Sequence, residues 1–359
     1  MKTATDTRSF VFPGLTTRVV FGSGTIAQVG DEVARLGHDK ALVLSTPHQK
    51  AEAEALAARL GRVSAGVYAG AAMHTPVEVT DDALAAYRAS GATSVVSLGG
   101  GSTTGLGKAI AARTGADQVV IPTTYAGSEM TDILGETAKG EKTTRRDPSI
   151  RPETVVYDVD LTLSLPVGMT VTSAMNAIAH AMEALYAPDL NPVIAAMARD
   201  ALPAFRSSLP VLAKDPANKP ARGEALYAAW CCSTALGYVS MALHHKLAHV
   251  LGGTFNTPHA ETHAILLPYT TAFNEVAVAG KLQPIAETFG GGSAGGGLWD
   301  FARSLGAPLS LGGLGLTAAD LDRAAEIAVA NPYKNPRDFG RGDIRDLLQA
   351  AWEGRRPGI

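Results

Sequence analysis

The strongest constraint on the fold is a regular alternation of short apolar runs and alanine-rich stretches over the first 160 residues. The run "KALVLST" (40–46) is typical of a buried strand, and "HQKAEAEALAARLG" (48–61) after it is typical of a helix that ends at a glycine. The runs "TSVVSLGGGS" (93–102) and "DQVVIPTT" (117–124) continue the pattern, again with a helix-forming stretch between them. Strands that alternate with helices of about ten to fifteen residues favour parallel βαβ units. The sequence therefore predicts an α/β domain with a parallel, Rossmann-like sheet over residues 1–160.

The character of the chain changes near residue 160. The run "VVYDVDLTLSLP" (155–166) is the last strand-like segment. The long Ala- and Leu-rich segments that follow it are 169–187, 193–213, 218–250, 318–330 and 342–353. We therefore expect an all-α helical-bundle domain over residues 161–359. The glycine-rich run "FGGGSAGGG" (289–297) is expected to be a flexible surface loop.

Composition excludes several classes of protein. The net charge of −3 gives no reason to expect nucleic acid or an anionic membrane as a partner. Neither a run of eighteen apolar residues nor the apolar core of a signal peptide is present in the sequence. The only two cysteines, Cys231 and Cys232, are adjacent in a helical stretch, where they are expected to be small buried side chains. We expect a cytoplasmic protein.

Two turns follow neighbouring strands and carry residues suited to a phosphate group. Glycines let the backbone approach a pyrophosphate, and a helix that begins there offers free N–H groups. The residues of these turns expected to contact a dinucleotide are Gly99, Gly100, Gly101, Ser102, Thr123, Thr124 and Ser128. A tight strand-to-helix turn without a ligand is the alternative for the glycines. Because both turns fall at the carboxyl edge of the predicted sheet, a dinucleotide crevice is favoured.

Five of the nine histidines lie within "HHKLAHVLGGTFNTPHAETH" (244–263). His245 and His249 are four residues apart and so share one helical face, as do Asn176 and His180 in an earlier segment. A single histidine on an apolar face is usually a core residue with a satisfied ring. Several histidines at helical spacing in two segments favour a shared site, which we expect in the cleft between the two domains.

Taken in order, "GGGS", "PTT…GSE", "DLTLSLP", the N-x-x-x-H helix and the histidine-rich segment resemble the iron-containing alcohol dehydrogenase superfamily. Within it, "TTYAGSEMT", "HHK…HVLGGTFNTPHAETHA" and "NPYKNPR" (331–337) are most similar to the maleylacetate reductases. The resemblance implies a dehydroquinate synthase-like architecture and a homodimer. It also implies NAD(P)H-dependent reduction of the conjugated double bond of maleylacetate to 3-oxoadipate, in the catabolism of aromatic compounds. A metal-dependent alcohol or polyol dehydrogenase is the main alternative, and a lyase of the dehydroquinate synthase type is another.

The metal site of the superfamily consists of an Asp and three His residues. The matching positions in this sequence are Asn176, His180, His245 and His259. The amide at Asn176 lacks the charge of the Asp, and a neutral oxygen is a weaker ligand for a divalent cation. Three imidazoles are still sufficient for a zinc ion with an open position. We expect that a metal is not obligatory.

Two departures from the superfamily pattern concern the coenzyme. The "GGGSxxDxxK" turn has Gly105 in place of its Asp, whereas Lys108 is retained. Ser45 and Thr46 follow the strand after which many relatives place an Asp for the adenosine ribose. Without that acid nothing repels a 2′-phosphate, so we expect both NADH and NADPH to be coenzymes.

The resemblance also assigns roles around a dicarboxylate substrate. His249 is the expected proton donor or electrophile, and His180, His245 and His259 are expected to polarise the substrate oxygen as imidazolium groups. Asn176 is expected to tune the pocket towards a dianion, because an Asp there would repel it. The candidates for binding the substrate carboxylates are Tyr125, His244, Lys246, His263, Tyr333 and Arg337. An exposed helix charge is an equal alternative for Lys246.

Overall fold

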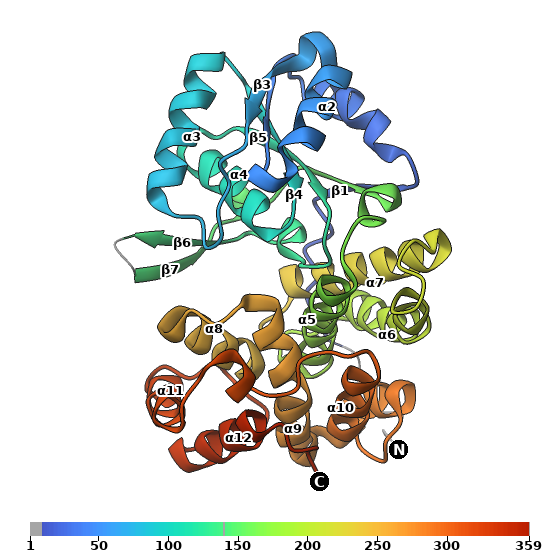
Figure 1. The fold of residues 1–359 in the computed structure, drawn as a ribbon, viewed down its shortest axis with the longest axis vertical. Coiled ribbons are helices and arrows are strands. Elements are labelled where there is room, and N and C mark those ends of the chain that lie inside the picture. The colour runs from blue at the N-terminus through green and yellow to red at the C-terminus, as the bar shows by residue number, and fades with distance from the viewer. Residues whose placement is uncertain (1–8, 139–140, 359) are drawn as a thin grey trace.

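The computed structural model describes residues 9–138 and 141–358 of the chain. An α/β domain stands above a helical domain in Figure 1. The six strands of the central sheet are β1 (Arg18–Gly22), β2 (Ala41–Leu44), β3 (Ser64–Tyr68), β4 (Ser94–Gly99), β5 (Asp117–Pro122) and β8 (Thr154–Asp158). All their pairings are parallel, in the order β1-β8-β5-β4-β2-β3. This arrangement confirms the predicted sheet.

The strand order identifies where a ligand crevice forms. From β2 the chain moves outward to β3, whereas from β4 it moves the other way, to β5. The order therefore reverses between β2 and β4, and ligands of such sheets bind outside the carboxyl ends of the strands at this point. Ser45 follows β2 and Gly99 ends β4, so the first predicted turn and the residues after β2 lie at the reversal. The second predicted turn follows β5, which is the neighbour of β4 in the sheet.

Both faces of the sheet are covered by helices, which explains the uninterrupted apolar strands. The helices of this domain are α1 (Val29–Arg35), α2 (Lys50–Leu60), α3 (Val77–Ser90) and α4 (Gly101–Thr114). Val43 packs in one core cluster with residues of α1 and α2, whereas Leu42 and Leu44 pack in another with residues of α3 and α4. Alternate residues of one strand thus supply two cores, as the two-residue period of a strand requires.

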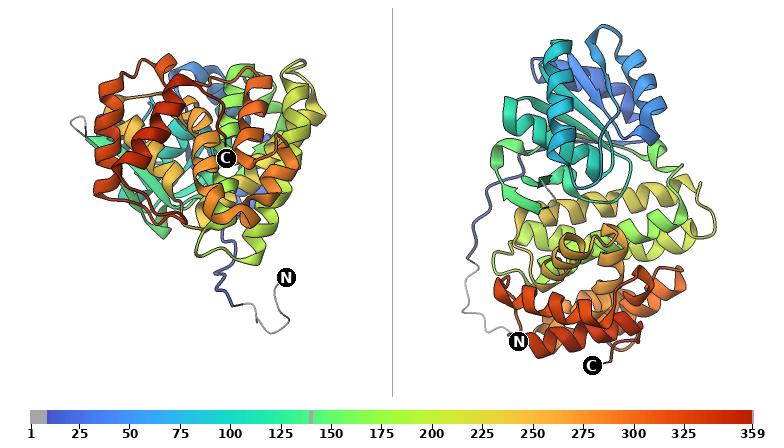
Figure 2. Two further views of the ribbon diagram at one scale, coloured as in Figure 1. Left: turned by 90° about the horizontal axis from the view of Figure 1, so that it is seen from below. Right: turned by 60° about the vertical axis from the view of Figure 1, so that its left-hand side comes forward.

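The second half of the chain is helical, as predicted. Its helices are α5 (Val167–Tyr186), α6 (Pro192–Leu212), α7 (Lys219–Tyr238), α8 (Leu243–Phe255), α9 (His259–Phe289), α10 (Ala294–Ser304), α11 (Ala318–Ala330) and α12 (Arg341–Glu353). The two views of Figure 2 show this bundle stacked against one end of the sheet domain. In the described part of the chain no single helix is long and apolar enough to cross a membrane. Only α7 and α8 together, bent by 92°, pass that test of length and composition.

Two details add to the sequence expectations or differ from them. The Ala- and Leu-rich segment 218–250 is divided between two helices, α7 and α8. The glycine-rich run 289–297 is not a flexible loop, because α10 begins at Ala294 and buries the glycines that follow. A Cβ on Gly295 would lie 2.5 Å from the Cβ of Ala272, so glycine is needed where α10 crosses α9 closely.

An antiparallel hairpin, which we did not predict, leaves the sheet domain. Its strands are β6 (Ile133–Ala138) and β7 (Glu141–Arg146). Figure 1 shows the hairpin extending over α8 of the helical domain. Thr143 and Thr144 of β7 line a hollow together with residues of α8 and α11.

Candidate active site

Helix α5 presents Asn176, His180 and Glu183 on one face, because their spacings of four and three residues match the helical period. All three side chains are almost fully buried. Asn176 Nδ2 donates to the carbonyl of Ala126 at 3.4 Å. Asn176 Oδ1 and His180 Nδ1 have no hydrogen-bond partner among the described residues. Buried polar atoms are nearly always paired, so these orphaned atoms mark a place where a ligand or water completes the site.

Glu183 is a site residue that the sequence analysis missed. Its carboxylate accepts hydrogen bonds from the backbone N–H groups of Ala242 at 2.8 Å and His244 at 2.7 Å. It also lies 2.7 Å from His245 Nδ1, so it fixes the orientation of that ring. His245 Nε2 is left buried without a partner in the described structure. The signal available in the sequence was that Glu183 is the only charged residue of α5 and lies seven positions after Asn176.

The structure brings all six predicted histidines of α5, α8 and α9 together. The centroid separations of neighbouring rings are 5.1 Å for His180 and His245, 5.0 Å for His245 and His263, 4.4 Å for His259 and His263, 4.9 Å for His244 and His263, and 6.1 Å for His245 and His249. The loop after β5 closes the cluster from the side of the sheet, since a Cβ on Gly127 would lie 3.0 Å from His180 Cε1.

Two predicted carboxylate ligands form the buried back of this cluster. His244 lies with Nδ1 2.9 Å from Thr270 Oγ1 and Nε2 2.8 Å from His263 Nδ1. Both ring nitrogens of His244 are therefore engaged, and its side chain is fully buried. The expectation that His244 binds a substrate carboxylate finds no support in these contacts.

The charge state of the cluster also differs from the expectation. Burial, together with the positive charge of neighbouring imidazoles, holds the pKa of His180, His244 and His263 well below the usual range. These rings are neutral at pH 7. This differs from the expectation that His180 is an imidazolium.

A hollow of about 560 Å³ opens beside the histidine cluster, between α8, α11 and the β6–β7 hairpin. Lys246, His249 and Tyr333 line it, and His249 Nδ1 lies 3.3 Å from the Tyr333 hydroxyl. Arg323 of α11, which the sequence analysis missed, lines the same hollow. Burial lowers the pKa of Lys246, whose Nζ lies 5.6 Å from the centroid of the Tyr333 ring. No acidic residue is among the described residues that line this hollow, so it suits an anion.

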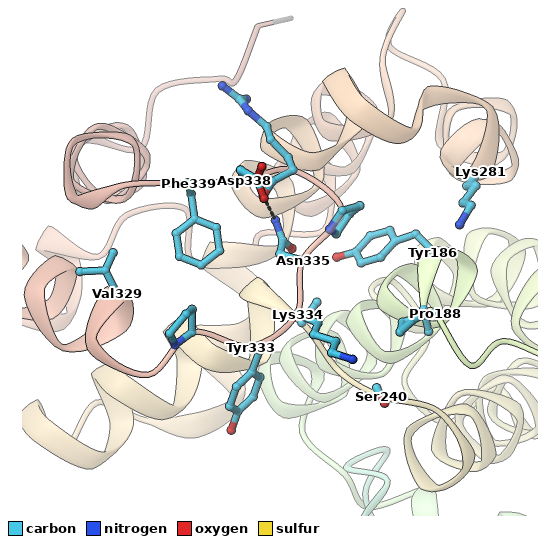
Figure 3. A pocket seen from close by; sticks show the side chains of 15 residues that line it. Tyr186, Pro188, Ser240, Lys281, Val329, Tyr333, Lys334, Asn335, Asp338 and Phe339 are labelled. Atoms are coloured by element: carbon cyan, nitrogen blue, oxygen red, sulfur yellow. Dashed lines mark hydrogen bonds between the residues drawn. The ribbon is translucent and has the colours of Figure 1, made fainter.

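The segment 331–337 passes between this hollow and a second cavity of about 740 Å³. In Figure 3, Tyr333 points away from Asn335 and Tyr186, which face the second cavity. Arg337 donates from NH1 to the carbonyl of Phe273 at 3.0 Å and stacks its guanidinium 3.9 Å from the centroid of that ring. Arg337 therefore anchors the segment, and it also lines the second cavity. Its role as a ligand of a substrate carboxylate stays a prediction.

Tyr125 lies away from the histidine cluster, in the core of the helical domain. Its side chain is fully buried and packs 6.2 Å from the ring of Phe205, centroid to centroid. Its hydroxyl accepts a hydrogen bond from the Arg222 guanidinium at 3.3 Å. This position in the core of the helical domain is closed to a substrate.

At the carboxyl end of the sheet the two coenzyme turns touch. Gly99 has a φ of +150°, and a Cβ there would lie 2.5 Å from Thr103 Oγ1. Gly100 precedes the first turn of α4, and a Cβ on it would lie 3.0 Å from Thr124 Oγ1. The backbone N–H of Thr123 donates to Gly99 O at 3.1 Å. The absence of side chains at the glycines thus keeps the N-terminus of α4 open to a phosphate.

The segment after β2 is hydrogen-bonded to the turn after β5. Gln49 Nε2 donates to Thr123 Oγ1 at 3.1 Å. Ser45 Oγ, at the end of β2, is buried without a hydrogen-bond partner among the described residues. Thr46 begins the short helix that carries Gln49. Ser45 and Thr46 therefore lie beside the turn after β5, to which Gln49 is bonded.

Lys108 lies below the coenzyme turns instead of within them. Its ammonium donates to the carbonyls of Ser128 at 2.6 Å and Ile133 at 3.0 Å, and to Thr131 Oγ1 at 2.8 Å. The side chain is fully buried, and this burial lowers its pKa to about 7. Lys108 therefore holds the loop that leads to the hairpin, and these contacts give no support to a direct contact with the coenzyme. At Gly105 the space for a side chain is filled by the Thr75 hydroxyl.

Comparison with known proteins agrees with this architecture. A family model described as iron-containing alcohol dehydrogenase matches residues 16–159, and the model of the C-terminal part of that family matches residues 170–352. The chain therefore belongs to the iron-containing alcohol dehydrogenase family.

Within the family, the chain is 60% identical over 348 residues to the maleylacetate reductase of Rhizobium sp. (strain MTP-10005). The match covers 97% of this chain and 99% of the relative. The chain is 50% identical to maleylacetate reductase 1 of Rhodococcus opacus, in a match that covers 97% of this chain and 98% of that relative. The crystal structure of maleylacetate reductase from Agrobacterium tumefaciens superposes with a TM-score of 0.95 at 59% identity, over 98% of this chain and 100% of that one. These findings confirm the resemblance drawn from the motifs.

The residues at the inherited metal position do not fit a divalent cation well. Among the described residues, no three or more His, Cys, Asp or Glu side chains are arranged to hold a metal ion. Asn176 offers a neutral amide oxygen, and the nearest carboxylate on α5, Glu183, is engaged by two backbone N–H groups and His245.

Proposed function

We propose that this enzyme transfers a hydride from NADH or NADPH to the conjugated double bond of maleylacetate and releases 3-oxoadipate. The observation that carries the proposal is the match to maleylacetate reductase at 60% identity over 97% of the chain. The hollow lined by Lys246 and Arg323, without an acidic residue among its described lining, supports a substrate with two carboxylates.

The coenzyme lies at the reversal of strand order. The pyrophosphate binds the N-terminus of α4 through the turn 99–102, with Thr123, Thr124 and Ser128 beside it. Ser45 and Thr46 face the adenosine ribose. Because neither is acidic, a 2′-phosphate is tolerated, and both coenzymes support turnover.

The reaction needs an acid–base site and no further redox group. Hydride attack on the carbon β to the ketone leaves an enolate, whose oxygen must be stabilised and whose α carbon must be protonated. His245, held in one orientation by Glu183, and His180 and His259 beside it face the enolate oxygen. His249, paired with Tyr333, supplies the proton.

The carboxylates of the substrate are bound in the adjoining hollow. Lys246 and Arg323 provide the two positive charges, and the Tyr333 hydroxyl provides a hydrogen-bond donor. Asn176 keeps the pocket free of a negative charge at the position where the family has Asp. His263 lies behind His259 in the pocket. The Nε2 atom of His263 has no hydrogen-bond partner among the described groups.

We also propose that a metal is not obligatory, and chelation tests this. The purified enzyme is dialysed exhaustively against EDTA. With maleylacetate as substrate, it is expected to oxidise NADH at the same rate as the undialysed enzyme. The rate is measured from the absorbance of the coenzyme. Asn176→Asp restores the family's carboxylate, so it is expected to bind Zn²⁺ more tightly in a titration and to raise KM for maleylacetate.

Two outcomes contradict parts of this proposal. If EDTA abolishes activity and Zn²⁺ or Fe²⁺ restores it, the metal-free mechanism is wrong. If the enzyme as purified oxidises alcohols with NAD⁺ and leaves maleylacetate unreduced, it is a metal-dependent alcohol dehydrogenase of the same family.

The homodimer implied by the resemblance remains a prediction. Its support is that Phe10 and Val11 ahead of the edge strand β1 are 52% and 87% exposed, which is unusual for apolar side chains in one short segment. Light scattering coupled to size exclusion chromatography measures the mass directly. A single species near 37 kDa, the mass of one chain, would contradict the dimer.

A further inference from the structure

The segment 331–337 carries Tyr333 but has no regular secondary structure. It connects α11, which ends at Ala330, to α12, which begins at Arg341. Such a segment has no ladder of backbone hydrogen bonds, so other contacts must fix its path. The position of Tyr333 beside His249 therefore depends on whatever holds this segment.

A reciprocal pair of amides holds it. Asn335 Nδ2 donates to Asn274 Oδ1 at 2.7 Å, and Asn274 Nδ2 donates back to Asn335 Oδ1 at 3.0 Å. Asn335 Nδ2 also donates to the carbonyl of Arg337 at 2.7 Å, a bond that Figure 3 shows as a dashed line. Asn274 is a fully buried residue of α9. The segment is thus tied to the core of the helical domain by a side chain that both donates and accepts.

The pair is continuous with the histidine cluster. Asn274 Nδ2 also lies 3.1 Å from the Tyr186 hydroxyl, which lies 3.5 Å from Glu183 Oε1. Glu183 in turn orients His245. The same buried amide therefore adjoins both residues that flank the proposed reaction site, Tyr333 through the segment and His245 through Glu183.

We propose that Asn335 and Asn274 are positioning residues, whose reciprocal hydrogen bonds set Tyr333 against His249 and so determine how the enzyme binds its dicarboxylate substrate. This inference rests on the proposed function for its substrate. Neither residue touches the reacting atoms. Their effect is exerted through Tyr333, which lines the hollow that Lys246 and Arg323 also line.

A change of the Asn335 amide to a carboxylate distinguishes a residue that positions the segment by hydrogen bonds from one that only fills space. Asp has nearly the shape of Asn, but its carboxylate cannot donate to Asn274 Oδ1 or to the Arg337 carbonyl. A residue that only fills space would tolerate Asn335→Asp, whereas a residue that must donate would not. Leaving buried polar groups unpaired is costly enough to shift the segment.

The experiment measures KM and kcat for maleylacetate and KM for NADH in Asn335→Ala, Asn335→Asp and the control Asn331→Ala. Asn331 belongs to the same segment and is exposed, and the structure gives its side chain no hydrogen bond in the described region. We expect about a tenfold rise in KM for maleylacetate in both Asn335 variants, with KM for NADH unchanged. The control is expected to match the wild type.

A double-mutant cycle tests the route through Tyr333. In a Tyr333→Phe background, Asn335→Ala is expected to change KM for maleylacetate less than about twofold, because the hydroxyl that it positions is already absent. An equal tenfold rise in that background, or a wild-type KM for Asn335→Asp, would overturn the inference.

Hydrogen exchange separates this inference from the proposed function. If the wild type does not reduce maleylacetate, the proposed function has failed, but backbone amide exchange in 331–337 can still be followed by mass spectrometry. Faster exchange in Asn335→Asp than in Asn331→Ala supports the anchoring role. Equal exchange in the two variants overturns it.

Discussion

At the carboxyl end of the sheet the candidate site is made of main-chain groups and short side chains, whereas on the helical domain it is made of long side chains from separate helices. The coenzyme turns occupy 99–102 and 123–128, each contiguous in sequence. On the opposite side, residues of three distant segments meet through hydrogen bonds: Glu183 of α5 contacts His245 of α8, and Tyr333 contacts His249 of α8. A site made of backbone tolerates change at one side chain, while a network of side chains depends on each member.

The largest expected effect lies in that network, at Glu183. Glu183→Gln preserves the shape of the side chain but has only one acceptor oxygen for three donors, so His245 loses its fixed orientation. We expect kcat for maleylacetate to fall about 10²- to 10³-fold, within the range of positioned acid–base groups. Steady-state kinetics with saturating NADH measures this change.

Glu275→Gln is the matched control. Glu275 is also a buried carboxylate that accepts two backbone N–H groups, those of Ala294 and Gly295, but it caps α10 away from the histidines. We expect it to lower the melting temperature while leaving kcat near the wild-type value. Equal losses of kcat in the two variants would mean that Glu183 only supports folding.

The same contrast explains what the sequence could predict. The alternation of strands and helices and the turn "LGGGS" depend on neighbours in the chain, so the sheet and the coenzyme crevice could be predicted. The histidines of α5 and α8 could be predicted because they repeat at helical spacing. Their partners could not, since Glu183 meets His245 only after α5 and α8 pack together.

Several predicted site residues share one physical property. Tyr125, His244, Arg337 and Lys108 carry chemistry suited to a ligand, but each already bonds to a group of the protein itself. A motif indicates which functional groups are available. Only the packed structure shows which of them remain unpaired, as Asn176 Oδ1 and His245 Nε2 do.

Lys108 is the exception within the coenzyme half, because it is a long side chain that anchors a distant loop. Its pKa is lowered to about 7 in the folded state, while an unfolded chain keeps the proton up to about 10.4. Between these values the unfolded state binds more protons, so the free energy of unfolding rises with pH by at most about 1.4 kcal/mol per unit. Below pH 7 both states are protonated, and this contribution no longer changes.

Urea unfolding at pH 7, 8 and 9 checks this prediction. The wild type is compared with Lys108→Met. This variant lacks the ionisable group of Lys108 and keeps all other ionisable groups. The difference in the free energy of unfolding between the two proteins is expected to grow in favour of the wild type as the pH rises. A difference that is constant over this range would show that Lys108 stays protonated, held by its three acceptors.

The smallest expected effect is at Thr46, in the half that is built from backbone. Thr46→Asp places a carboxylate where the adenosine 2′-phosphate of NADPH is expected, and the site is partly exposed. Solvent and salt screen such a charge, so we expect kcat/KM for NADPH to fall only about fivefold, with NADH unaffected. Thr46→Asn introduces a neutral side chain of the same shape as Asp. Its kcat/KM for each coenzyme is expected to equal that of the wild type. The discrimination should shrink as ionic strength rises, because it comes from charge alone. If Thr46→Asp leaves kcat/KM unchanged for both coenzymes, the ribose lies elsewhere, and β2 does not contribute to the crevice at the reversal of strand order.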